Sequence, residues 1–294
     1  MAHRPVLLQK TIQELDPQEG QTVIDGTVGF SGHALALGEK LGPEGFLLGL
    51  DQDPEALKQA EKTLTQSPTR FLLKQGNFRD LIKLTHEAGI NSADIILFDL
   101  GMSSWQIEGS GRGFSFLRDE PLLMTMSDSG QDLTAKMIIN HWSERELADL
   151  FYYLSDEPAS RKIAKAIVEA REVEEITTSG QLASLIEKAK PRRGRKRIHP
   201  ATLVFQALRM EVNKELTALT EGLEQAWSIL APKGKLGVIS FHSLEARIIK
   251  KFFREKTQDQ TGKLKTKKAV KPDHEEIKDN PRARSANLRV IIKN

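Results

Sequence analysis

The chain of 294 residues is about twice the usual size of a single domain, so it has room for one large domain or two ordinary ones. With 39% hydrophobic residues, 28% charged residues and only 12 prolines, its composition excludes a disordered or collagen-like protein. Its formal net charge of +3 is too small to indicate a partner. The chain has no cysteine, which excludes disulfides, thiol nucleophiles and cysteine-ligated metals and favours a cytoplasmic protein.

The apolar segments are short. None approaches the roughly 18 residues that a membrane span needs, and the N-terminal residues lack the apolar core of a signal peptide. We therefore expect a soluble protein without a membrane partner.

The first hundred residues alternate short apolar runs with amphipathic stretches. Apolar runs at 22–25, 46–51, 71–73 and 94–99 predict strands, and the stretch 54–65 predicts a helix. Strands that alternate with helices are typical of βαβ units and a parallel sheet. We therefore predict a doubly wound α/β core.

Strand signals then stop for more than a hundred residues, and helical patterns replace them. Ser143 with Glu146, and Thr178 with Gln181, form capping boxes ahead of apolar residues at helical spacing. This part of the chain is therefore expected to be helical.

The end of the chain resembles its beginning. Apolar runs at 235–241 and 287–292 predict that the sheet resumes, whereas the polar, lysine-rich stretch 255–284 predicts a mobile surface loop. A helical insertion into one α/β domain is the simplest arrangement, because loops at the carboxyl edge of a parallel sheet accept insertions. We place a discontinuous Rossmann-like domain at 1–107 and 212–294, and an inserted helical domain at 108–211.

A glycine-rich turn follows the first predicted strand. Gly26, Gly29 and Gly32 have the spacing Gly-x-x-Gly-x-x-Gly, and Asp51 closes the next strand. Glycines let the backbone approach a ligand, and an acid at the second strand end can accept hydrogen bonds from two ribose hydroxyls. The spacing differs from that of dinucleotide enzymes, so S-adenosylmethionine is favoured over a nicotinamide cofactor, and a merely tight turn is the less favoured alternative.

Two more residues are candidates for the same crevice. Asp99 ends the fourth predicted strand, where it could orient an amine for methylation or simply cap a turn. Phe78 follows the third strand and could stack on adenine, although taken alone it is better explained as a core residue. His33, His199 and His242 show no spacing typical of a metal site, so we predict no metal.

A dense basic segment lies in the predicted helical domain. Lys188–Arg197 contains seven basic residues in ten and no acid, and five more lysines follow between Lys263 and Lys271. Such density is expected for binding to a phosphate backbone, with a solvated surface as the alternative. The residues predicted to contact RNA are Arg192, Arg193, Arg195, Lys196 and Arg197.

Taken together, these motifs resemble those of the ribosomal RNA small-subunit methyltransferase H family, also called MraW. The resemblance covers nearly the whole chain. The matching stretches are His3–Leu8, Asp25–His33, Asp51–Pro54, Asp99–Ser104, Arg112–Phe116, His199–Thr202, Phe205–Arg209, Ser240–Glu245 and Asn280–Ser285.

The resemblance implies a Rossmann-like class I methyltransferase sheet with an inserted helical domain. It implies methyl transfer from S-adenosylmethionine to the exocyclic N4 amine of a cytidine in the decoding region of 16S rRNA. The partner would be small-subunit rRNA or the small ribosomal subunit particle, and the oligomeric state stays open, with a homodimer as one option. The family's cofactor-contacting positions correspond here to Ser31, Gly32, His33, Asp51, Phe78, Asp99 and Gln106.

Because the lone pair of a cytosine amine is delocalised into the ring, the amine is a poor nucleophile. We therefore expect positioning of the amine, with Asp99 as the candidate group, to matter more than a strong base. No covalent enzyme intermediate is needed, which agrees with the absence of cysteine.

Four positions depart from the family's usual pattern. Ser31 replaces a glycine, Leu123 an acid and Thr125 a base, and Leu203 stands where many members have arginine. These departures leave open a catalytically weakened ribosome-assembly factor that binds rRNA. An amine methyltransferase for another nucleic acid or a protein is a further alternative, since the same cofactor site would serve it.

Overall fold

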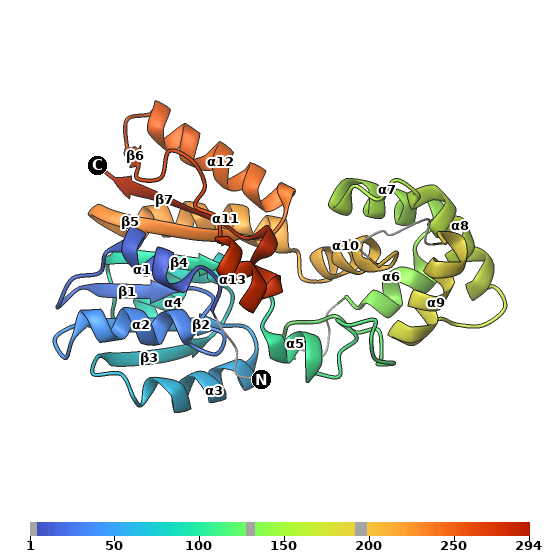
Figure 1. The fold of residues 1–294 in the computed structure, drawn as a ribbon, viewed down its shortest axis with the longest axis horizontal. Helices are drawn as coiled ribbons and strands as arrows, with labels where there is room; N and C mark the ends of the chain where they lie inside the picture. The colour runs from blue at the N-terminus through green and yellow to red at the C-terminus, as the bar shows by residue number, and fades with distance from the viewer. Residues whose placement is uncertain (1–4, 128–132, 192–198) are drawn as a thin grey trace. The chain divides into compact units, whose positions relative to one another are not determined.

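The computed structural model describes residues 5–127, 133–191 and 199–294. Within it the chain divides into two compact units, which Figure 1 draws as ribbons. The sheet unit comprises Met1–Ser103 and Leu216–Asn294, and the helical unit comprises Ser104–Glu215.

A seven-stranded sheet with the order β3-β2-β1-β4-β5-β7-β6 forms the centre of the sheet unit. Its strands are β1 (Thr22–Asp25), β2 (Phe46–Asp51), β3 (Arg70–Gln75), β4 (Ala93–Asp99), β5 (Leu230–Ser240), β6 (Gly262–Leu264) and β7 (Asn287–Lys293). The first five strands pair in parallel, whereas β7 runs antiparallel to β5 and to β6. The predicted Rossmann-like class I methyltransferase sheet is confirmed.

Helices cover both faces of this sheet because successive strand residues point to opposite sides and both sides are apolar. Ile24 and Phe98 belong to one buried cluster, together with residues of α4 (Leu81–Glu87), α11 (Glu215–Ile229) and α12 (Ser243–Gln258). Val23 and Leu97 belong to the other, together with residues of α1 (Leu8–Leu15), α2 (Gly32–Leu41) and α3 (Pro54–Leu64). The carboxyl ends of the parallel strands are thereby fixed at one edge.

The segment 255–284 differs from its prediction as a mobile surface loop. Helix α12 continues to Gln258, β6 follows, and α13 (His274–Asp279) and the 3₁₀ helix η2 (Pro281–Ser285) complete the segment. Strand β6 has only three residues, and its order comes from pairing with β7, for example Gly262 with Lys293. Such a short strand shows no hydrophobic period, so the prediction was wrong for lack of a local signal.

The described part of the helical unit contains α5 (Ser104–Glu108), α6 (Ala135–His141), α7 (Glu144–Ser155), α8 (Ser160–Arg171), α9 (Ser179–Ala189) and α10 (Thr202–Val212). Both predicted capping boxes are confirmed: Ser143 with Glu146 begins α7, and Thr178 with Gln181 begins α9. Among the residues that the structure describes, no helix is both long enough and apolar enough to cross a membrane.

Candidate active site

The glycine-rich turn connects β1 to α2 at the carboxyl edge of the sheet. Its backbone is left-handed at Gly29 (φ +48°) and at Ser31 (φ +65°), a region that costs a residue with a side chain about 1–2 kcal/mol. A Cβ atom on Gly32 would lie 2.1 Å from Pro5 Cγ, so no side chain fits there. The Ser31 hydroxyl is buried and has no hydrogen-bond partner among the described residues. Glycine at position 32 therefore lets the Pro5 ring pack directly against the turn, and within the described chain the Ser31 hydroxyl is the polar side-chain group that this turn leaves without a partner.

Asp51 ends β2 beside this turn and is held by two backbone donors. Gly29 N–H donates to Asp51 Oδ2 and Asp53 N–H donates to Asp51 Oδ1, each at 2.9 Å. Burial raises the pKa of Asp51 to about 6, against the lowering effect of these two hydrogen bonds. Each carboxylate oxygen keeps a further lone pair. The arrangement can accept two hydroxyl groups of a ribose.

Asp25 and Asp99 end the neighbouring strands β1 and β4, and Thr27 links them. Thr27 N–H donates to Asp25 Oδ1 at 3.1 Å, and Asp99 N–H donates to Thr27 Oγ1 at 2.6 Å. Burial is the main cause that raises the pKa of each carboxyl to about 7; the charge of Asp51 adds to this at Asp25, and the charge of Asp25 adds to it at Asp99. Three carboxyls of adjacent strands thus make this crevice suited to a cationic ligand.

His33, in the first turn of α2, orients Asp99. Its Nε2 lies 3.0 Å from the carbonyl oxygen of Val6. Because a carbonyl oxygen only accepts, Nε2 carries a hydrogen, and Nδ1 faces Asp99 Oδ2 at 3.6 Å. The other oxygen, Asp99 Oδ1, is buried and has no hydrogen-bond partner among the described residues. Asp99 therefore has one oxygen next to a histidine and one available to a ligand.

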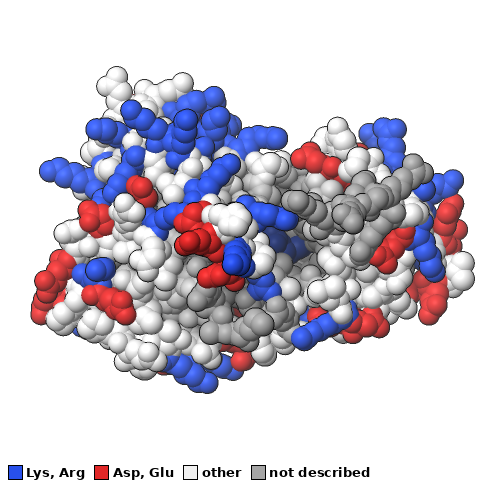
Figure 2. Space-filling view, in the orientation of Figure 1, with Lys and Arg blue, Asp and Glu red and all other residues white. Residues whose placement is uncertain are grey.

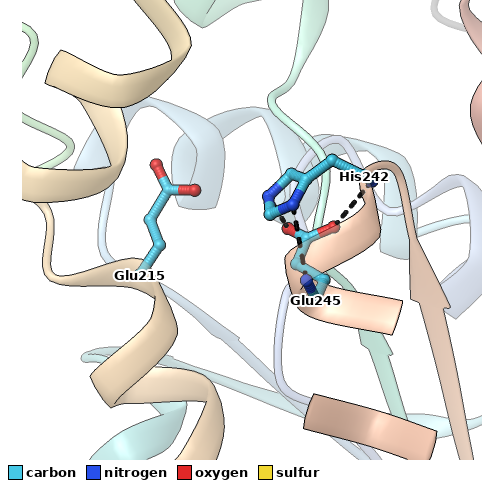
Figure 3. Close-up of side chains that lie close together, drawn as sticks. All are labelled: Glu215, His242 and Glu245. Atoms are coloured by element: carbon cyan, nitrogen blue, oxygen red, sulfur yellow. Dashed lines mark hydrogen bonds and ion pairs between the residues drawn. The ribbon is translucent and has the colours of Figure 1, made fainter. Parts of the chain in front are cut away.

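Glu245 is a fourth acid of this site, for which no role was predicted. His242 and Glu245 form a capping box where β5 enters α12: Glu245 N–H donates to His242 Nδ1 at 3.4 Å, and Glu245 Oε2 accepts from His242 N–H at 3.3 Å (Figure 3). Glu245 Oε2 also accepts from Phe241 N–H at 2.8 Å. Glu245 is buried, and its charge adds to the rise of the pKa of Asp99. A Glu three residues beyond a polar residue after an apolar strand is the signal that could have located it.

Glu215, also drawn in Figure 3, belongs to the helical unit. There its carboxylate accepts two hydrogen bonds from Arg209, at 2.7 and 2.8 Å. This bidentate ion pair joins the end of α10 to the start of α11.

Phe78 packs partly into the core, in the 3₁₀ helix η1 (Phe78–Asp80). The centroid of its ring lies 4.7 Å from that of Phe98, and a Cβ atom on Gly222 would lie 2.4 Å from the ring. The ring is half-buried, so its packing role is observed, whereas stacking on an adenine stays a prediction.

The other predicted site residues lie elsewhere. Gln106 is buried in α5 of the helical unit, whereas Ser31, Gly32, His33, Asp51, Phe78 and Asp99 all belong to the sheet unit. The predicted RNA-contacting residues Arg192, Arg193, Arg195, Lys196 and Arg197 lie outside the described residues.

Comparisons with known proteins agree along the whole chain. The model of the MraW methylase family matches residues 1–294. A protein of Syntrophotalea carbinolica named ribosomal RNA small subunit methyltransferase H is 44% identical, with 98% of this chain and 97% of that protein covered. Proteins of the same name from Nitrosococcus oceani and Dictyoglomus thermophilum are each 45% identical, and cover 99% and 98% of this chain and 97% and 95% of their own lengths.

The left-handed backbone of Ser31 gives a first prediction. We expect Ser31→Gly to raise the free energy of unfolding of the ligand-free protein by about 1 kcal/mol, because glycine adopts this conformation without a steric cost. Ser31→Ala, the matched control, loses the same hydroxyl but keeps the strain, and should give no such gain. Urea unfolding of both variants measures this, and equal stabilities would contradict it.

Asp25 gives a second prediction. Its pKa is raised to about 7. Its contribution to the free energy of unfolding is therefore fully present at pH values below the usual pKa of an aspartate, and it is lost as the pH rises through 7. At pH 8, Asp25→Asn should therefore make the ligand-free protein more stable by about 1–3 kcal/mol, and at pH 4 the difference should nearly vanish. Thermal unfolding at both pH values measures it, with the exposed Asp80→Asn as control. A gain that does not depend on pH would show that burial of the charge is not its cause.

Proposed function

The chain belongs to the MraW methylase family, and on that premise we propose that it transfers a methyl group from S-adenosylmethionine to the exocyclic N4 amine of a cytidine in the decoding region of 16S rRNA. The family match spans the whole chain, and the relatives are named for methylation of small-subunit ribosomal RNA. The structural observation that carries the proposal is the row of carboxyls at the ends of β2, β1 and β4, of which Asp25 is buried and Asp51 and Asp99 are half-buried.

The residues at this edge fit the cofactor. S-adenosylmethionine, when bound, supplies an electrophilic methyl group on a positively charged sulfur. The raised pKa values of Asp25, Asp51 and Asp99 mean that a nearby cation would be favourable, because it would stabilise their charged forms. Asp51 has lone pairs left for the ribose hydroxyls. The proposed cofactor-contacting residues are Ser31, Gly32, His33, Asp51, Phe78, Asp99 and Gln106.

Asp99 is the proposed catalytic residue. Its unpartnered Oδ1 accepts a hydrogen bond from the cytosine amine and so aligns the nitrogen lone pair with the methyl group. Transfer of the methyl group would form the nitrogen–carbon bond and break the carbon–sulfur bond, so that S-adenosylhomocysteine would leave and the methylated amine would pass one proton to water. His33 is a positioning residue, because its Nδ1 lies against the other oxygen of the same carboxyl and its Nε2 is fixed by Val6.

RNA binding and location complete the proposal. The basic segment with Arg192, Arg193, Arg195, Lys196 and Arg197 would contact rRNA or the small ribosomal subunit particle through phosphates. A cytoplasmic location follows from such a substrate. Nothing in the described residues favours another amine substrate.

Labelled-methyl transfer to unmodified small ribosomal subunits tests the activity. We expect the label in N4-methylcytidine, and we expect Asp51→Ala to lose at least a hundredfold in kcat/KM because the ribose contacts disappear. The exposed Glu61→Ala on α3 is the matched control and should retain activity. Absence of label with wild-type protein that binds both cofactor and RNA would overturn the proposed activity.

The role of Asp99 is tested by a pH profile. Because its pKa is raised to about 7, protonation below that value removes the acceptor, and kcat/KM should fall about tenfold per pH unit on the acid side. The charges of Asp25 and Glu245 and the ring of His33 also face this carboxyl. Asp99→Asn should lower kcat by about 10²–10⁴-fold and remove most of the acid limb. A nearly unchanged kcat would exclude Asp99 from the chemical step.

A further inference from the structure

Helix α12 carries a stripe of positive charge along one face. Four exposed cations lie on this face: Arg247, Lys250, Lys251 and Arg254. Lys250 and Lys251 are each three or four residues from Arg247 and from Arg254. Residues at these spacings lie on the same side of a helix, and this stripe extends for about 10 Å. The opposite face is apolar and buried, with Ile249, Phe252 and Phe253 in the core of the sheet unit.

Strand β6 and the residues after it extend this charge. β6 packs beside α12, and Lys263, Lys267 and Lys268 are exposed, with Lys265 half-buried between them. In Figure 2, Lys and Arg side chains gather over the part of the sheet unit where Figure 1 draws α12 and β6. The chain between Ser243 and Lys271 contains ten Lys and Arg but only three Asp and Glu, although the whole protein has a net charge of only +3.

These cations are poorly neutralised. Within the described part of the chain, no ion pair is recorded for Arg247, Lys250, Arg254, Lys263, Lys265, Lys267 or Lys268. Lys251 has one acid partner, Glu255 at 3.9 Å. Glu245, one of the three acids of the stretch, is buried in the active site. Like charges three and four residues apart on a helix destabilise it, so a stripe of this kind costs stability unless a partner neutralises it.

We propose that the cations of α12 and of the segment 263–268 form a docking surface for the phosphate backbone of the RNA substrate. The surface consists of Arg247, Lys250, Lys251, Arg254, Lys263, Lys265, Lys267 and Lys268. The identity of its ligand rests on the function proposed above. It is distinct from the basic segment 188–197, which belongs to the helical unit.

RNA fits this surface better than a lipid membrane does. Helices that lie on membranes expose large apolar side chains beside their basic residues. The large hydrophobic residues found exposed among the described residues are Leu72, Trp105, Leu117, Leu123, Met137, Tyr152, Tyr153 and Val173, none of them in α12 or β6.

Protection of an exposed strand does not explain the surface either. β6 is the last strand of the sheet, and lysines on such a strand discourage pairing with another chain. That reason applies to Lys263 of β6 but not to the four cations of α12, which lie on a helix.

The test replaces the helical stripe by glutamine, in the variant Arg247→Gln, Lys250→Gln, Lys251→Gln and Arg254→Gln. Glutamine keeps the helix propensity of the replaced residues. The matched control, Lys40→Gln, Lys58→Gln, Lys62→Gln and Lys83→Gln, removes the same charge from exposed positions of α2, α3 and α4 in the same unit. The affinity of each protein for unmodified small ribosomal subunits is measured from 50 to 300 mM KCl, together with cofactor affinity and melting temperature.

For the stripe variant we expect at least a tenfold weaker affinity at 100 mM KCl. Its plot of log K against log salt should become shallower by about 3, because each lost phosphate contact removes roughly 0.7–0.9 from the slope. Cofactor affinity should stay that of the wild type, the melting temperature should not fall, because like charges are removed from one helix face, and the control variant should keep the wild-type slope. A stripe variant with the wild-type slope would overturn the proposed docking surface. Equal losses of affinity in the stripe variant and the control variant would overturn it as well.

Two further measurements separate the other outcomes. Wild-type methyl transfer to the same subunits reports on the proposed function independently: its absence, with a salt slope that still depends on the stripe, would refute the activity and leave the docking surface standing. Sedimentation with phosphatidylglycerol vesicles tests a membrane. Stripe-dependent binding to vesicles without stripe-dependent binding to RNA would overturn the proposal.

Discussion

The structure of the site depends on three carboxyl groups that are held out of water at the ends of adjacent parallel strands. The register that pairs Asp25 with Gly49 of β2 and with Leu97 of β4 brings the strand ends to one edge. Burial there opposes ionisation, so the ligand-free protein keeps these groups in an unfavourable state. The same desolvation makes each of them interact strongly with a cation. Desolvation of these carboxyls therefore lowers the stability of the ligand-free fold but favours the binding of a cation. The surrounding hydrogen bonds reduce the loss of stability.

The sequence located this site because its signals are local. Asp51 and Asp99 each follow an apolar run, and the ends of parallel strands meet at one edge of the sheet, so these two residues and the glycine-rich turn predict one crevice. Asp25 was not predicted as a site residue, although it ends the strand before that turn. Glu245 was missed because its approach to Asp99 depends on the pairing of β4 with β5 across more than a hundred intervening residues. β6 was missed for a related reason, since three residues ordered by a distant partner leave no pattern of their own. Local patterns thus located the strands and their acids, but not contacts set by tertiary pairing.

The positions that depart from the family pattern at Leu123 and Thr125 lie in the helical unit, away in sequence from every carboxyl of the site. The loop around them is held through its backbone. Arg112 Nη1 donates to the carbonyl oxygen of Thr125 at 3.2 Å, and Met126 N–H donates to Asn213 Oδ1 at 2.8 Å. A backbone carbonyl is present whatever the side chain, so the replacement at Thr125 leaves this contact intact.

The small net charge of the protein conceals two opposite charge distributions within the sheet unit. Acidic groups are buried at the carboxyl edge, and basic groups are exposed along α12. A cationic cofactor and a polyanionic RNA need opposite local charge, and at physiological ionic strength a separation of about 8 Å already weakens the mutual interference of such charges. Burial of the acids adds to this effect, because their charges act most strongly on a ligand inside the crevice. The charges suited to the two ligands have opposite signs and largely cancel in the net charge of +3. The positions of the charges, rather than their sum, therefore indicate the function.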